Sequence, residues 1–427
     1  MLFPYFLRIL PGILLLLGTS CASRMQDTCP LASINIIDRD GLSETICNPD
    51  RLKKYVNIDF FCTQPYQKVL RVYKRDACGE VFAYVTSYHP NGQVKQYLEV
   101  CNGRAFGTYL EWYDSGVLKV EANVIGGMPD ITMLAEKSWL FDGVNKAWDD
   151  NGTLLAEISY FKGALHGTSL YYHPNKAIWK RISYEKNELH GKMEVFLENG
   201  ELFQTIEYVV GQKEGTSLRY WGPGKIASQE IYSEGKLITG NYFNLCGELV
   251  TNIDDGRGYR ALFGKDSLAE LQEYRNGLME GAVKVYGTNQ RLLRLYHVKN
   301  GLKHGEEIEY FDRTVKGKEL QPKLSIAWYE GKIQGVVKTW YDNGVQESQR
   351  ELSQNVKNGL ATGWYRDGSL MLIEEYDHNK LLKGEYFKRG EKIPTTVIEG
   401  SKGIATLHDA EGNFLRRVIY LNGVPNE

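Results

Sequence analysis

The sequence has little proline, and it lacks the short motifs that mark common catalytic or cofactor sites. It contains 12 Pro against 44 Gly and 28 Tyr in 427 residues. It has no GxSxG segment for a serine nucleophile and no Cys-x-x-Cys pair for zinc or redox chemistry. The segment Gly222–Ser228 contains Gly-Lys but lacks the first glycine of a phosphate-binding loop. We therefore predict that the protein is not an enzyme and uses no cofactor.

An excess of charge of either sign is also missing. The 51 Lys and Arg nearly balance the 53 Asp and Glu, which gives a formal net charge of -2 and a pI near 6.5. Nucleic-acid-binding domains carry a dense positive surface, so we predict no nucleic-acid partner. One basic cluster between residues 53 and 75 is typical of a solvated surface; it consists of Lys53, Lys54, Lys68, Arg71, Lys74 and Arg75.

The only long apolar run lies at the N-terminus and is too short to span a membrane as a helix. Arg8 precedes the apolar run Ile9–Leu17, and small residues follow before Cys21. This pattern predicts an export signal at residues 1–21. Its end resembles a bacterial lipoprotein signal, in which Cys21 becomes the lipid anchor, although Leu17 lies four residues before the cysteine rather than three. The alternative is ordinary cleavage after Ala22.

The other cysteines are even in number and agree with export. Four of the six fall in the segment with the weakest repeat pattern, where disulfides stabilise a small core. We predict disulfides among these four, with all three connectivities open; the alternative is that they are free thiols. They are Cys29, Cys47, Cys62 and Cys78.

The chain repeats itself with a period of about 24 residues. Glycines open successive units at this spacing: Gly143, Gly167, Gly191 and Gly215, later Gly281 and Gly305, and Gly335 and Gly359. An aromatic residue lies five positions after each opening glycine. In most units a second glycine lies nine positions after the opening glycine. Such a period is the mark of a stacked repeat array, in which neighbouring units bury a common core.

The apolar residues of each unit predict strands. In the unit that contains Gly200, Leu202, Ile206 and Tyr208 lie two, six and eight residues beyond that glycine. These offsets share parity and predict that the three side chains lie on one face of a strand. The Asn-Gly and Asp-Gly pairs that end at Gly92, Gly152, Gly344 and Gly368 predict tight hairpin turns. A short helix is predicted at Asn48–Tyr55.

Units such as Gly191–Gly215 resemble MORN-type repeats, and they are most similar to a bacterial variant associated with antitoxins of toxin–antitoxin systems. The likeness extends from about Tyr84 to Gly423. It implies an all-β fold, an elongated twisted antiparallel sheet of successive β-hairpins. We therefore expect a Cys-containing cap at residues 22–80 and a MORN-like array at 81–427.

Histidines and turn acids do not indicate a metal site. His166 and His190 each precede an opening glycine, a place where MORN-type repeats commonly carry histidine. The acidic turns that end at Gly152 and Gly344 lack the spaced oxygen ligands of a calcium loop.

Aromatic pairs provide the candidate ligand or partner surface. A Trp recurs at one place of the unit and is often followed by a Tyr, and adjacent strand residues point to opposite faces. One member of each pair is then core, and the other is available to a partner; the alternative is that both serve packing. The candidates are Trp112, Tyr113, Trp148, Trp340, Tyr341, Trp364 and Tyr365.

These patterns predict an exported, lipid-anchored scaffold that binds a protein partner at the bacterial cell envelope, on the outer membrane or its periplasmic face. A soluble periplasmic or secreted protein is the alternative location. An alternative function is binding of cell-wall glycan or a small ligand in aromatic pockets between hairpins. The antitoxin role implied by the family fits an export signal poorly, because toxins are usually neutralised in the cytoplasm.

Overall fold

The computed structural model describes residues 30–313 and 320–426. The predicted export signal, the lipid-anchor residue Cys21 and Cys29 lie outside the described residues. Most of the described chain is β-strand, in a single long antiparallel sheet of successive hairpins that does not close on itself. This confirms the predicted fold class.

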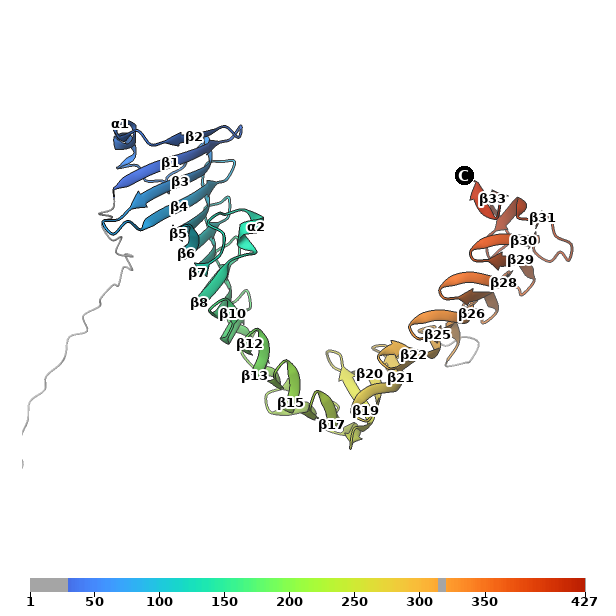
Figure 1. Cartoon of the computed structure of the whole chain (residues 1–427). Helices are drawn as coiled ribbons and strands as arrows, with labels where there is room; N and C mark the ends of the chain where they lie inside the picture. The colour runs from blue at the N-terminus through green and yellow to red at the C-terminus, as the bar shows by residue number, and fades with distance from the viewer. Residues whose placement is uncertain (1–29, 314–319, 427) are drawn as a thin grey trace, which may run out of the picture. The chain divides into compact units, whose positions relative to one another are not determined.

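The chain divides into two units (Figure 1). The first holds residues up to Leu154 together with Tyr160–Ala164, and β9 (Leu154–Phe161) and β10 (Ala164–Leu165) contribute to both units. Its other strands are β1 (Leu31–Asp38), β2 (Ser43–Ile46), β3 (Gln67–Arg75), β4 (Val81–Tyr88), β5 (Val94–Cys101), β6 (Arg104–Trp112), β7 (Leu118–Gly126) and β8 (Leu140–Trp148). Its helices are α1 (Pro49–Leu52), a 3-10 turn at Lys53–Tyr55, and α2 (Met133–Glu136).

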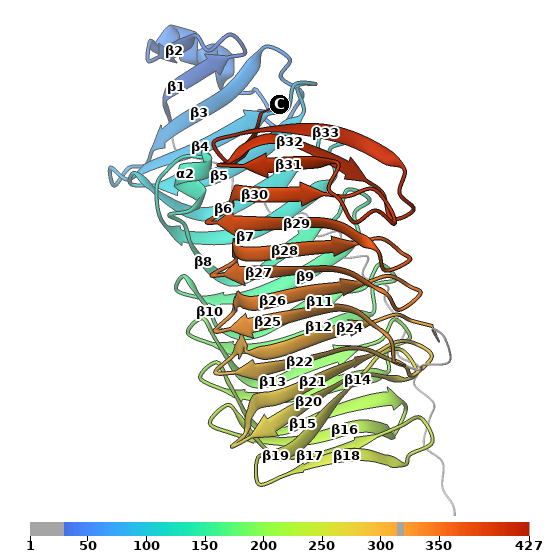
Figure 2. The ribbon, with the colours of Figure 1, turned by 90° about the vertical axis from the view of Figure 1, so that its right-hand side faces the viewer.

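The second unit consists of hairpins whose strands pair in chain order, and Figure 2 shows these strands one after another. Its strands up to the middle are β11 (Gly167–Tyr172), β12 (Ile178–Glu185), β13 (Glu188–Phe196), β14 (Leu202–Val209), β15 (Gln212–Gly222), β16 (Lys225–Ser233), β17 (Lys236–Phe243), β18 (Leu249–Asp254), β19 (Arg257–Phe263), β20 (Leu268–Arg275), β21 (Leu278–Tyr286) and β22 (Leu292–Lys299). The remainder are β23 (Leu302–Lys303), β24 (Gly305–Tyr310), β25 (Pro322–Tyr329), β26 (Lys332–Trp340), β27 (Gln346–Ser353), β28 (Val356–Trp364), β29 (Leu370–Asp377), β30 (Lys380–Tyr386), β31 (Thr396–Glu399), β32 (Lys402–His408), β33 (Phe414–Leu421) and β34 (Val424–Asn426).

The hairpin turns have the predicted geometry. In the first repeat the backbone N–H of Gly92 donates to the carbonyl of His89, and Gly92 adopts a φ of 87°. Where the sequence replaces this glycine, Lys176 and Gln290 take the same left-handed conformation, with φ of 69° and 60°. The turn geometry is therefore kept even where the residue type disfavours it.

A recurrent β-bulge corrects the expectation that three apolar positions of a unit share one face. In the pairing of β4 with β5, Ser87 lies opposite Gln96 and Tyr88 opposite Val94, so Lys95 is an extra residue. Such a residue shifts the alternation of the strand. Val94 consequently packs in a different cluster from Leu98, which lies on the other side of the bulge.

An insertion between β7 and β8 interrupts the period in the first unit and covers one face of its sheet. Ile131, Ala135 and Trp139 of this insertion are buried in the same cluster as Tyr109. The rings of Trp139 and Tyr109 lie 4.7 Å apart. Arg71 holds Asp130 of the insertion through two 3.0 Å hydrogen bonds. The insertion is thus a fixed part of the core.

The segment before the array continues the sheet instead of forming a separate fold. β3 pairs with β4, and β1 pairs with β3 and β2. The predicted helix begins at Pro49, with the side chain of Asn48 accepting from the backbone N–H groups of Asp50 and Arg51. Within the described residues, no helix has the length and apolar character needed to cross a membrane.

Cys47, Cys62 and Cys78 are free and exposed in this structure. Their disulfides therefore stay a prediction, and the partner Cys29 lies outside the described residues.

Candidate interaction surface

Residues at the hairpin turns join each repeat to the next. The Tyr341 hydroxyl donates to the carbonyl of Trp364 at 2.8 Å, and that of Tyr365 to the carbonyl of Phe387 at 2.6 Å. In the first unit the Tyr113 hydroxyl reaches the carbonyl of Trp148 at 2.9 Å in the same way. The three predicted tyrosines therefore serve contacts between repeats, and Tyr341 and Tyr365 are 7% and 0% exposed.

Histidine makes the same kind of link in other repeats, and asparagine adds a second link in the turn of Tyr341. A ring nitrogen of His89 lies 2.9 Å from the carbonyl of Trp112, and that of His173 lies 2.9 Å from the carbonyl of Phe196. The Asn343 amide donates to the carbonyl of Arg366 at 2.7 Å. The asparagine of an Asn-Gly turn thus both shapes its own turn and holds the next one.

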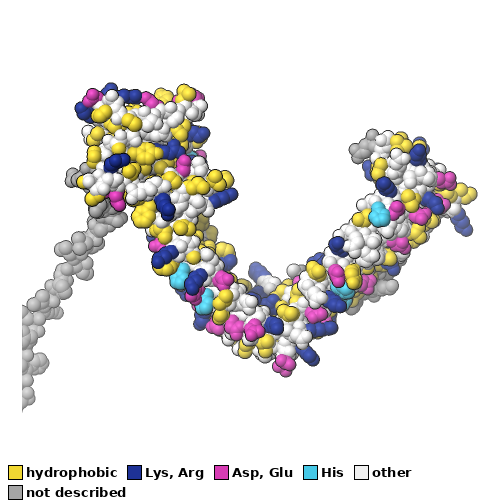
Figure 3. All heavy atoms as spheres, viewed as in Figure 1, with side chains coloured by type: hydrophobic (Ala, Val, Ile, Leu, Met, Phe, Trp, Pro, Cys, Tyr) yellow, Lys and Arg dark blue, Asp and Glu magenta, His cyan; other side chains and the backbone are white. Residues whose placement is uncertain are grey.

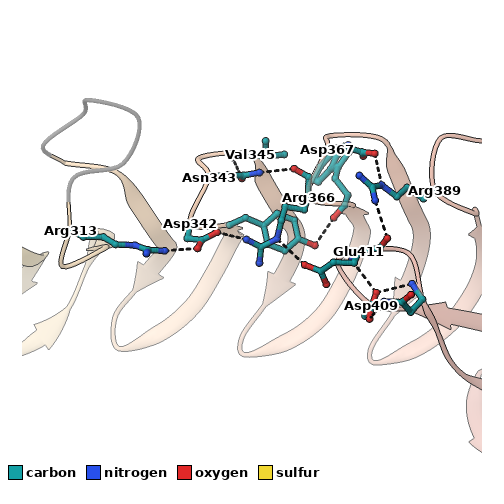
Figure 4. A network of polar contacts seen from close by, with 12 residues as sticks. Arg313, Asp342, Asn343, Val345, Arg366, Asp367, Arg389, Asp409 and Glu411 are labelled. Carbon is teal, nitrogen blue, oxygen red and sulfur yellow. Dashed lines mark hydrogen bonds and ion pairs between the residues drawn. The ribbon is translucent and has the colours of Figure 1, made fainter.

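A network of charged residues runs along the turns of the last repeats (Figure 4). Asp342 pairs with both Arg313 and Arg366, and Arg366 lies 3.1 Å from Glu411. Arg389 pairs with Asp367 at 2.6 Å and donates to the carbonyl of Glu411 at 3.1 Å. Each charge in this network faces a partner of opposite sign, so the network stabilises the edge and leaves no isolated charge for a ligand.

The pKa values of the acids in this network follow from these partners. Hydrogen bonds from Ser369 and the ion pair with Arg389 hold the pKa of Asp367 well below its usual range. Desolvation raises the pKa of Asp342, but the hydrogen bond from Arg313 and the charge of Arg366 outweigh it and lower the pKa. Both carboxylates are therefore ionised throughout the physiological range.

The predicted tryptophans are half-buried and have different surroundings. The ring of Trp112 lies 6.1 Å from the ring of Phe61, which comes from the segment before the array. Trp112 also packs against the cluster around Leu70. Its role is packing of that segment against the repeats. Trp148, Trp340 and Trp364 end their strands at the equivalent place, with partial exposure.

Sequence reasoning missed a glutamate that explains several opening glycines. The Glu351 carboxylate accepts from the backbone N–H of Leu360 at 3.1 Å, and a Cβ on Gly359 would lie 2.1 Å from its Oε2. The same arrangement recurs with Glu99 and Gly107, Glu207 and Gly215, and Glu273 and Gly281. The signal in the sequence is a Glu eight residues before the opening glycine.

A second missed feature is a carboxylate that accepts from two tyrosine hydroxyls near each of the opening glycines Gly240 and Gly384. The carboxylate of Glu230, 3% exposed, accepts from the hydroxyls of Tyr232 and Tyr242 and pairs with Arg260 at 2.6 Å. In the other repeat, Glu374 accepts from the hydroxyls of Tyr376 and Tyr386. The opening glycines Gly240 and Gly384 leave room for the hydroxyls of Tyr242 and Tyr386.

The comparisons with known proteins agree with this geometry. A family model described as "MORN repeat variant" matches residues 84–102, 141–162 and 189–209. This chain therefore contains repeats of the MORN variant type. The three matched segments lie on three of the hairpins described above, and the remaining units of the MORN-type array share their spacing. No curated protein matches the chain.

Among solved structures, the MORN-type chain aligns with a chain of the Photorhabdus luminescens Tc holotoxin pore. The two are 10% identical, with a TM-score of 0.16, and the alignment covers 92% of this chain. It covers 26% of the toxin chain, so this protein spans about a quarter of that length. A likeness of this size carries no argument about fold or function.

The surface of the repeats also has a shallow, open hollow of about 400 Å³, lined among others by Tyr310, Arg294 and Lys323. In the part of the chain that the structure describes, no group of three or more His, Cys, Asp or Glu is placed to hold a metal ion.

Proposed function

We propose that this protein is an exported, lipid-anchored scaffold that binds a protein partner at the cell envelope. The N-terminal sequence supports this location. A basic residue, an apolar run and a cysteine at position 21 follow one another in the order typical of a lipoprotein signal. The role in binding rests on the repeats.

The observation that carries the proposal is the link from each turn to the next repeat, as between Tyr365 and Phe387. Such links make consecutive hairpins a rigid surface, and repeat arrays use surfaces of this kind to bind macromolecules. Figure 3 shows acidic and basic side chains interspersed along the repeats of the second unit. A surface of mixed charge suits a specific protein partner better than a nucleic acid.

Metabolic labelling with a fatty acid tests the anchor. The unmodified protein is expected to carry the label, and Cys21→Ala is expected to lose it. Crosslinking in intact cells then tests the partner, with a discrete crosslinked protein expected in the membrane fraction. Absence of label in the unmodified protein removes the anchor, and absence of any crosslinked protein removes the scaffold role.

Binding of a glycan or small ligand is the second candidate, and the hollow beside Tyr310 favours it. Its volume lies in the range of small-ligand pockets. A glycan pull-down with the unmodified protein, with Tyr310→Ala in the hollow, and with Trp340→Ala and Trp364→Ala separates the two functions. Retention that the substitutions abolish supports the glycan, and no retention of the unmodified protein eliminates it. The antitoxin role is disfavoured by the export signal.

A further inference from the structure

Three successive repeats carry a large apolar residue at the bulge, a position that several other repeats fill with a charged residue. Trp179 is the extra residue between the pairs of Tyr171 with Lys180 and Tyr172 with Ile178. Phe203 is the extra residue in the next repeat, and Leu155 holds the same place, three residues beyond Gly152, in the one before. We name Leu155, Trp179 and Phe203 the apolar row. All three lie in the second unit.

The side chains of the apolar row are partly exposed to solvent, although the fold also accepts charged residues at this position. Leu155 and Trp179 are 43% and 40% exposed, and Phe203 is half-buried. The same position holds Lys95, Lys119, Lys323 and Glu347 in some repeats and apolar residues in others, among them Val250, Leu293, Met371 and Leu415. Ala227, in the repeat after Phe203, is fully buried. A charged residue is therefore compatible with the fold here, and the apolar residues do not serve the core.

Cations lie directly on the rings of the row. The Lys180 ammonium is 3.9 Å from the centroid of the Trp179 ring, and the Arg219 guanidinium is 5.1 Å from that of Phe203. Arg219 also lies 5.4 Å from the centroid of the Trp221 ring and donates to the carbonyl of Gly264 at 3.2 Å, so its remaining N–H groups and the Lys180 ammonium are what can face a ligand. The row thus combines apolar contact area with positive charge, which favours an acidic partner.

The spacing of the row selects the conformation of that partner. Successive members are two strands apart, because β11 lies between β9 and β12, and β13 between β12 and β14. Two strand spacings are roughly 9.6 Å. A polyproline II helix advances about 9.3 Å in three residues and presents every third side chain on one side. A β-strand covers a similar distance in three residues but turns every third side chain to the opposite face.

We propose that the apolar row binds a polyproline II segment of a protein partner, with an apolar residue at every third position and carboxylates that face Lys180 and Arg219. The inference rests on the proposed scaffold function and names the chemistry of the partner. The segment runs across the strands and places successive apolar side chains at Leu155, Trp179 and Phe203.

The test is fluorescence anisotropy of the full chain with a labelled twelve-residue peptide of four Pro-Pro-Glu units. Two control peptides have the same length and charge: four Gly-Ser-Glu units, which form no polyproline helix, and an amphipathic α-helix. Trp179→Lys is the central variant, because lysine occupies this position in three other repeats, as Lys95, Lys119 and Lys323. Met371→Lys makes the same change of charge at the same position of a distant repeat.

We expect the Pro-Pro-Glu peptide to bind in preference to both controls. Trp179→Lys is expected to raise the dissociation constant about tenfold or more, although it adds a positive charge, and Met371→Lys is expected to leave it unchanged. Equal binding to Trp179→Lys and the unmodified chain, or equal affinity for Gly-Ser-Glu or the helix, overturns the proposal. Should the cellular crosslink persist in Trp179→Lys, the scaffold function stands and the row is not its binding site.

Discussion

The hydroxyl of Tyr365 lies 2.6 Å from the backbone carbonyl of Phe387, one repeat ahead, and the tyrosine is fully buried. A side chain at a turn, where exposure is the usual state, is here part of the interior. The same link through Tyr341 shows that it belongs to the repeat plan and is no accident of one turn.

Replacement of Tyr365 by Phe is expected to destabilise the protein by about 1–2 kcal/mol, because the carbonyl of Phe387 loses its partner in a buried place. Urea unfolding followed by tryptophan fluorescence measures the change. The control is Tyr329→Phe, since Tyr329 is 51% exposed. A loss of stability as large in the control as in Tyr365→Phe contradicts the assigned role of the hydrogen bond.

The opening glycines lead to a second prediction. Gly359→Ala is expected to destabilise the protein by about 1–3 kcal/mol, because φ is 114° and the new methyl group meets the Glu351 carboxylate. Adding Glu351→Ala is expected to restore part of the loss, since it removes the collision but not the backbone strain. Gly200→Ala, where a Cβ meets nothing within 4 Å, isolates the strain. Strictly additive effects of Gly359→Ala and Glu351→Ala refute the collision.

The repeats were predictable because their signals are local. The Asn-Gly turns need only the left-handed preference of one residue, and the period of 24 fixes the hairpins that join them. The bulge at Lys95 was not predictable, since nothing in the alternation of the strand marks an extra residue. Its consequence is that Val94 and Leu98 lie in different clusters despite their equal parity.

The candidate surface was harder to predict than the fold. Tyr341 and Tyr365 were candidates for a ligand or partner surface, because a sequence does not show that a side chain at a turn reaches the next repeat. Glu351 resembles any surface carboxylate until Gly359 is brought beside it by strand pairing. Contacts between repeats are set by the stacking of hairpins, and the stacking follows from many residues at once.

Glu230 gives the protein a pH-dependent stability. Burial raises the pKa of its carboxyl, but the charge and hydrogen bonds of Arg260 outweigh burial and lower it below the ordinary 4.5. Because the pKa is lower in the folded state, the stabilisation is present above about pH 4.5 and is lost as the pH falls through the folded value. The difference in unfolding free energy between the unmodified protein and Glu230→Gln is therefore expected to be largest near pH 7 and to shrink below pH 4.5. Urea titrations at pH 7, 5 and 3.5 check it, and a difference that is constant over this range contradicts the ion pair.

The hydrogen-bonded clusters around Glu230 and Glu374 can be compared directly, because both contain two buried tyrosines. Glu230 and Glu374 each accept from two buried tyrosines. Ala405 of β32, two residues beyond Gly403, occupies the place that Arg260 of β19, two residues beyond Gly258, holds beside Glu230. Removing the charge of Glu230 leaves a guanidinium unpaired in the interior, which is expected to destabilise by about 3–5 kcal/mol.

Within the described residues Glu374 forms no ion pair, and Lys357 donates to the hydroxyl of Tyr376 at 3.4 Å and not to the carboxylate, so Glu374→Gln leaves no cation without its partner. A glutamine still accepts a hydrogen bond from a tyrosine. The expected loss is about 1 kcal/mol. Combining Glu230→Gln with Arg260→Met is expected to recover much of the larger loss, since the unpaired cation is removed as well. Urea unfolding of the three variants at pH 7 decides the matter: equal losses for Glu230→Gln and Glu374→Gln would show that the tyrosines, and not the guanidinium, set the stability of both clusters.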